Sequence, residues 1–81
     1  MSTVTQRVKD ILIDKLCLDE DFKFDNSTDL HEDLGMDSLD AVECLMEIEC
    51  EFQLNIPDDA IEKVHTFGDI VNLIISMRGY E

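Results

Sequence analysis

The residue best placed for chemistry is Ser38, which follows a glycine turn and an aspartate at the predicted start of a helix. Free N–H groups and the helix dipole make such a position favourable for an anion. Residues 35–39 read G-M-D-S-L, which is not the nucleophile motif G-x-S-x-G, and only His31 and His65 could supply a base. We therefore expect no catalytic residue here. Taken alone, Ser38 could equally be a helix-start serine with no other role.

The cysteines suggest neither a metal site nor a disulfide framework. Cys17, Cys44 and Cys50 form no C-x-x-C pair. Cys44 and Cys50 would lie about 120° apart on a helix, too far to share a metal, and we expect both to be packing residues. No calcium loop of the form D-x-[DN]-x-[DN]-G-x5-E occurs, which argues against a calcium-binding module. We expect reduced thiols, no metal and a cytoplasmic protein, because no apolar leader is visible.

Helix signals dominate the rest of the chain. Apolar residues at helical spacing predict a helix over residues 3–17, a second helix over 37–52 and a short third helix over 58–64. The second and third helices are each expected to begin under an Asp cap. Thr66, with Asp69 in the capping-box position, begins a last helix that Gly79 ends. The sequence thus predicts one domain over residues 1–81, an all-α, small four-helix bundle with a long loop after the first helix.

The second helix carries two apolar stripes, although a helix with one partner needs only one. The first spans about 100° of arc and is the expected core face, formed by Ala41, Cys44, Leu45, Ile48 and Phe52. The second is formed by Leu39, Val42, Met46 and Cys50, with acids beside it. Either loop residues cover this second stripe, or it docks a partner whose Lys and Arg meet the surrounding carboxylates.

The charge distribution favours a docking surface. Six Lys and Arg stand against twenty Asp and Glu, a net charge of −14. Between Lys23 and Lys63 there are thirteen acids and no Lys or Arg. Such a chain repels phosphate backbones and anionic headgroups, so we expect basic protein partners, no nucleic acid and no membrane insertion. We expect a monomer, and we expect charge reversal at Asp40, Glu43 or Glu49 to leave the fold intact.

The residues around Ser38 resemble the signature of the acyl carrier protein family. Residues 33–40 read D-L-G-M-D-S-L-D, with V-E at 42–43 and E-C-E-F at 49–52, and the similarity runs over nearly the whole chain. The resemblance implies that Ser38 is esterified by 4′-phosphopantetheine, whose thiol carries an acyl group as a thioester. The protein would then be a carrier of fatty-acid synthesis, not an enzyme.

The resemblance also implies partners and docking positions. The partners would be a phosphopantetheinyl transferase and acyl-transferring, ketosynthase, reductase and dehydratase enzymes that present basic patches. An aminoacyl or polyketide carrier, or an acidic interaction protein without a prosthetic group, remain alternatives. The docking positions implied are Asp37, Leu39, Asp40, Val42, Glu43, Met46 and Glu49.

The acyl chain needs shelter from water, because its exposed surface costs about 25 cal/mol per Å². We expect a pocket between the core arc of the second helix and the last two helices. Its expected lining is Ala41, Leu45, Ile48, Phe52, Ile61 and Ile74. Gly68, the cysteines of the second helix and a loop about one residue longer depart from the common bacterial pattern, which leaves a specialised pathway open.

Overall fold

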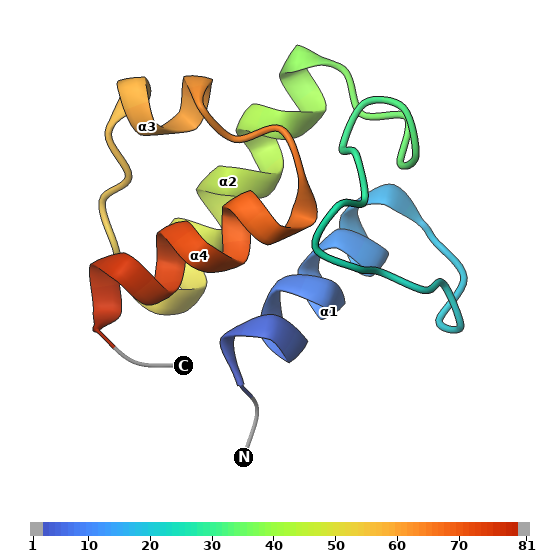
Figure 1. The fold of residues 1–81 in the computed structure, drawn as a ribbon, viewed down its shortest axis with the longest axis horizontal. Coiled ribbons are helices and arrows are strands. Elements are labelled where there is room, and N and C mark those ends of the chain that lie inside the picture. Colours follow the sequence, from blue (N-terminus) through green and yellow to red (C-terminus); the bar gives the residue numbers. More distant parts are fainter. Residues whose placement is uncertain (1–2, 80–81) are drawn as a thin grey trace.

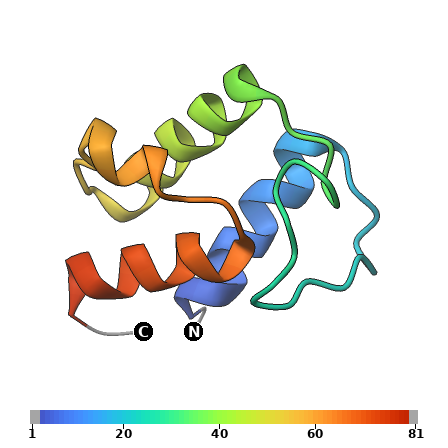
Figure 2. The same cartoon turned by 45° about the horizontal axis from the view of Figure 1, so that its top comes forward.

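The computed structural model describes residues 3–79 and confirms the predicted bundle of helices (Figure 1). Its helices are α1 (Val4–Leu16), α2 (Ser38–Phe52), α3 (Asp58–Glu62) and α4 (Phe67–Arg78). Both views place α3 at the side of the bundle opposite the long loop (Figure 1, Figure 2). Within residues 3–79 the only β-type pairing is an isolated bridge between Asp29 and Thr66. None of the helices in this range is long and apolar enough to cross a lipid bilayer.

The ends of α2 and α4 are set by their capping residues, as predicted. The Asp40 N–H donates to Asp37 Oδ1 over 2.8 Å, and the Asp37 N–H donates in return to the Asp40 carboxylate. Thr66 and Asp69 make the same reciprocal pair at the start of α4. Each box satisfies two N–H groups that the first helical turn would otherwise leave without partners.

The short helix α3 begins at Asp58, as predicted, but its cap and its last residue differ from the prediction. It ends at Glu62, two residues early, and its N-cap is Pro57, which offers no side-chain hydrogen bond. The expected Asp cap is therefore wrong, because Asp58 is already the first helical residue. No residue of α3 is buried. A helix this short, with neither a cap nor a buried side chain, contributes little to its own stability.

The core lies where α1 meets α2 and α4. It is formed by Val4, Val8, Ile11 and Leu12 of α1, Cys44, Leu45 and Ile48 of α2, and Phe67, Ile70, Val71 and Ile74 of α4, with Leu30, Leu34, Met36 and Ile56 from the connecting segments. The predicted core arc of α2 is thereby confirmed at its centre, while Ala41 and Phe52 lie at its half-buried edges.

The long loop, residues 18–36, is held to the start of α4 by backbone hydrogen bonds. The Leu30 N–H donates to the His65 carbonyl over 3.0 Å, and the Phe67 N–H donates to the Thr28 carbonyl over 2.9 Å. The Phe24 ring lies between those of Phe22 and Phe67, at 4.9 Å from each centroid. These contacts fix the loop that leads into α2, so the position of Ser38 depends on α4 as well as on its own helix.

Gly68 is required where the loop crosses α4. Its N–H donates to the Asn26 carbonyl over 3.1 Å. A Cβ atom at this position would lie 2.7 Å from that carbonyl oxygen and 2.9 Å from the Asn26 Cβ. The sequence indicated only that Gly68 departs from the common bacterial pattern. The structure shows that this glycine permits the close approach of two backbones.

We expect Gly68→Ala to lower stability in spite of the better helix propensity of alanine. The propensity gain is at most about 1 kcal/mol, whereas overpacking against a backbone atom costs about 1–3 kcal/mol. Thermal unfolding followed by circular dichroism should show a melting temperature lower by several degrees. Asn72→Ala, an exposed change on the same helix, is the control. A Gly68→Ala protein as stable as the wild type would contradict this account of the crossing.

Candidate functional site

Ser38 is exposed and is the first residue of α2. Its hydroxyl makes no hydrogen bond to any residue in the described range 3–79, whereas its neighbours Asp37 and Asp40 are engaged in the capping box. The hydroxyl therefore stands free at a rigid helix start. No histidine is hydrogen-bonded to it, so nothing in the described part of the chain would activate it as a catalytic nucleophile.

The turn before Ser38 is braced by contacts that the sequence did not reveal. Gly35 has a φ of 70°, which lets the chain reverse without strain. The Met36 N–H donates to the Leu30 carbonyl over 3.0 Å, and the Met36 side chain is buried. His31 Nδ1 lies 2.6 Å from the Met36 carbonyl oxygen. Because a carbonyl oxygen only accepts, Nδ1 must carry the hydrogen. The sequence, in which His31 and Met36 are five positions apart, did not predict this hydrogen bond.

Asp29 fixes the other side of the same turn. Its carboxylate accepts the N–H groups of Glu32 and His31, each over 2.8 Å. These hydrogen bonds, the one from Glu32 first, lower the pKa of Asp29 below its ordinary value because they favour the charged form. The turn therefore holds its shape at neutral pH, when Asp29 is ionised.

The position of Ser38 fits a covalently attached phosphate. The open hydroxyl gives room for a diester, and the N-terminal end of a helix favours negative charge. The N–H of Asp40 is already taken by the Asp37 carboxylate, so the first turn does not form a closed phosphate cradle. A phosphate ester here would point into solvent, as a flexible arm requires, instead of being held against the protein.

The second apolar stripe of α2 is uncovered. Leu39 is 66% exposed, Val42 44% and Met46 58%, and Cys50 is exposed as well. The alternative in which loop residues cover this stripe is therefore wrong. Exposed apolar side chains grouped on one helix are typical of an interaction site. This stripe begins one residue after Ser38 and runs along the same helix.

The acidic docking candidates divide into two groups. Asp37 and Glu43 are exposed, whereas Asp40 and Glu49 are half-buried. Asp37, Asp40 and Glu49 carry structural hydrogen bonds, and Glu43 has none among the described residues. Glu49 Oε2 accepts the Ile56 N–H over 2.7 Å and so ties α2 to the segment before α3. Charge reversal at Asp40 or Glu49 would remove a structural contact. We therefore keep the prediction that charge reversal spares the fold for Glu43 alone.

The expected acyl-pocket residues belong to the core or pack against it. Leu45, Ile48 and Ile74 are buried in the core. Ala41, Phe52 and Ile61 are half-buried and pack against it. The Arg78 guanidinium lies 5.2 Å from the Phe52 ring centroid and covers its outer face. The structure thus brings all six predicted residues into or against one core, and one of them, Ile61, belongs to the short helix α3 itself.

The cysteines have different environments. Cys44 is buried, and burial first, with Asp40 second, raises the pKa of its thiol to about 11. It is therefore an inert packing residue, as predicted. Cys50 is exposed, so its prediction as a packing residue is wrong. The error arises because Cys50 belongs to the second stripe, which nothing in the described chain covers.

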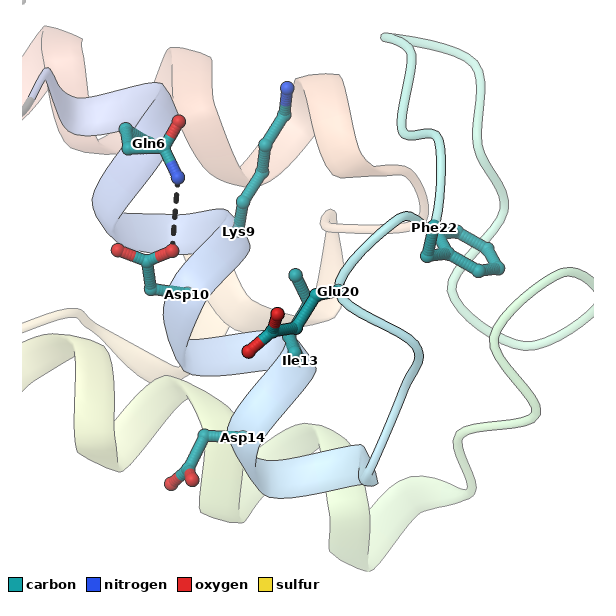
Figure 3. A pocket seen from close by; sticks show the side chains of 7 residues that line it. All are labelled: Gln6, Lys9, Asp10, Ile13, Asp14, Glu20 and Phe22. Atoms are coloured by element: carbon teal, nitrogen blue, oxygen red, sulfur yellow. Dashed lines mark hydrogen bonds between the residues drawn. The ribbon is translucent and has the colours of Figure 1, made fainter.

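A surface pocket of about 490 Å³ lies apart from Ser38, which is not among its lining residues (Figure 3). It is formed by one side of α1, from Gln6 to Asp14, together with Glu20 and Phe22 of the long loop. Gln6 Nε2 donates to Asp10 Oδ1 over 2.9 Å along its wall. Within residues 3–79, no three His, Cys, Asp or Glu side chains are arranged to hold a metal ion.

Comparisons with known proteins agree with this geometry. Residues 6–74 match the family model described as a phosphopantetheine attachment site. The fold is similar to an acyl carrier protein from Enterococcus faecalis, with 31% identity, a TM-score of 0.76 and coverage of 91% of this chain and 92% of the other. It is also similar to an acyl carrier protein from Thermotoga maritima, with 29% identity, a TM-score of 0.78 and coverage of 90% of this chain and 84% of the other. A third similar structure is a proposed acyl carrier protein from Mycobacterium tuberculosis, with a TM-score of 0.84 and coverage of 91% of this chain and 97% of the other. Its identity is 23%, so this similarity supports the fold alone.

Proposed function

Because this chain belongs to the phosphopantetheine-attachment family, we propose that it carries acyl groups as thioesters on a 4′-phosphopantetheine arm attached to Ser38. The observation that supports this proposal best is the free, exposed hydroxyl of Ser38 at the start of a helix with an uncovered apolar and acidic face. The arm supplies the thiol that holds the acyl group. The protein holds and presents this cargo, and partner enzymes do the chemistry on it.

The partner side of the proposal follows from the exposed stripe of α2. A phosphopantetheinyl transferase must reach Ser38, and acyl-transferring, ketosynthase, reductase and dehydratase enzymes must reach the end of the arm. Leu39, Val42 and Met46 offer them an apolar contact, and Asp37 and Glu43 offer charge for their basic patches. Fatty-acid synthesis is the pathway we propose, in the cytoplasm, where the free exposed thiols of Cys17 and Cys50 stay reduced.

Intact mass tests the carrier proposal directly. Purified apo-protein is incubated with a phosphopantetheinyl transferase and coenzyme A, and its mass should rise by one phosphopantetheine group. A protein that stays unmodified under conditions that convert a control carrier protein would instead be an acidic interaction protein. Acyl transfer onto the new thiol from malonyl and from aminoacyl donors then distinguishes a fatty-acid carrier from an aminoacyl carrier.

Charge reversal at Glu43 should weaken partner encounter without harming the fold. We expect Glu43→Lys to slow modification by the transferase several-fold at low salt, and to flatten the salt dependence of the rate. Stopped assays of holo-protein formation at several salt concentrations measure both effects. Glu20→Lys makes the same charge change at an exposed site on the long loop and is the control. Equal rate losses in the two variants would show that the net charge of the protein, and not the position of Glu43, controls the rate.

A further inference from the structure

The peptide group between Met36 and Asp37 lies one residue before Ser38 and is held at both of its polar atoms. Its carbonyl oxygen lies 2.6 Å from His31 Nδ1, the ring nitrogen that carries the hydrogen. Its N–H donates to the Asp40 carboxylate over the longer distance of 3.4 Å. Among the described residues, no second donor reaches this carbonyl oxygen. The contact with the His31 ring is therefore the shorter and stronger of the two that orient this peptide group.

The backbone of His31 is itself held by hydrogen bonds on both sides. The His31 N–H donates to Asp29 Oδ1 over 2.8 Å, and the His31 carbonyl accepts the Gly35 N–H over 3.1 Å. The preceding residue, Leu30, donates its N–H to the His65 carbonyl, just before α4. The His31 ring thus connects the anchored part of the long loop to the peptide group that leads into α2.

We propose that His31 is a positioning residue for the attachment of the arm to Ser38. The inference rests on the proposed carrier function and names a residue on which the rate of attachment depends. In that step the Ser38 oxygen bonds to the phosphorus that bears the pantetheine of coenzyme A, the P–O bond to the adenosine bisphosphate breaks, and that part leaves. The hydroxyl proton passes to a base of the transferase. A hydroxyl held in one place relative to the phosphorus reacts faster than one that moves, because near-attack geometry contributes much of the rate.

The contacts of His31 favour positioning over a chemical role or a role in stability. The ring makes no hydrogen bond to Ser38, and its Nδ1 is already engaged by the Met36 carbonyl. Because Nδ1–H is a donor in this neutral tautomer and in protonated imidazole, the hydrogen bond does not depend on protonation of the ring. His31 is exposed, and a single hydrogen bond adds little to the free energy of folding. Its loss should therefore change the rate of attachment more than the fold.

Removing the donor while keeping a side chain of similar size tests the proposal. With the transferase and coenzyme A, we expect His31→Leu to lower kcat at least about fivefold, while KM for the apo-protein stays within about twofold, because the exposed face of α2 is unchanged. His31→Asn places an amide N–H near the position of Nδ1 and should restore kcat to within about twofold of the wild type. Asparagine is no base, so this rescue separates a donated hydrogen bond from general-base catalysis. Initial rates of holo-protein formation, followed by intact mass at several apo-protein concentrations, give both constants.

His65→Leu is the matched control. It removes the same ring from the other histidine of the chain, an exposed residue whose side chain makes no hydrogen bond to the described residues, and it should keep the wild-type kcat. Wild-type kcat in His31→Leu, no rescue by His31→Asn, or an equal loss in His65→Leu would overturn the inference.

Two further readouts separate positioning from folding and from the carrier function. A rise of KM in His31→Leu, or a loss of its helical circular dichroism, would make His31 a residue of the fold and would also overturn the inference. If the transferase modifies the wild type and only the His31 variants behave otherwise than expected, the carrier function stands. A wild-type protein that the transferase does not modify would instead remove the carrier function, on which the inference depends.

Discussion

Ser38→Ala should abolish attachment of 4′-phosphopantetheine completely and leave stability almost unchanged. The hydroxyl is exposed and unbonded to the described residues, so its removal costs no packing and no hydrogen bond, and a change within about 0.5 kcal/mol is expected. Asp37, not Ser38, caps α2. Intact mass after incubation with the transferase and coenzyme A, together with a melting curve, measures both parts of the prediction.

Ser76→Ala is the matched control for this experiment. Ser76 is exposed on a helix like Ser38, but it lies on α4 and outside the α2 face. This variant should be modified at the wild-type rate. Modification of Ser38→Ala would assign the arm to another residue, and loss of modification in Ser76→Ala would mean that the assay reports on the fold.

Acylated holo-protein should melt at higher temperature as its acyl chain grows longer. Each buried methylene contributes up to about 0.8 kcal/mol, and in a domain of this size 1 kcal/mol corresponds to about 4–8 °C. Opening the bundle offsets part of this gain. The opening is inexpensive at α3, which has no buried residue and no side-chain cap. Calorimetry of forms loaded with acyl chains of increasing length should show the rise and then a plateau at the limit of the pocket.

Two substitutions test whether the chain enters the bundle. Ile61→Phe and Ala41→Phe add volume at half-buried edges of the expected pocket, so the plateau should come at a shorter chain length. Asp59→Phe adds the same ring at an exposed position of α3 and should leave the plateau unchanged. Melting temperatures independent of chain length would place the cargo on the outer surface.

The starts of α2 and α4, and with them the place of Ser38 at the start of α2, could be predicted from the sequence because their signals are local. Asp37 with Asp40, and Thr66 with Asp69, are capping boxes whose partners lie three residues apart. Such hydrogen bonds form wherever the helix forms, so spacing is enough to predict them. The residues of the two apolar stripes of α2 could also be predicted, because the helical period alone assigns residues to sides of a helix.

What covers each stripe of α2 depends on the packing of the whole chain and could not be predicted from spacing. Periodicity placed Cys44 and Cys50 on separate sides of α2, but it did not show that one is buried and the other open beside α1. The sequence predicts Glu49 as a docking acid, and only the structure shows that its carboxylate also accepts the Ile56 N–H. His31 is placed by its hydrogen bond to the Met36 carbonyl across a turn. Gly68 is needed because the backbone of Asn26 crosses α4 at this position. Contacts between segments depend on how the whole chain packs, and no local spacing encodes them.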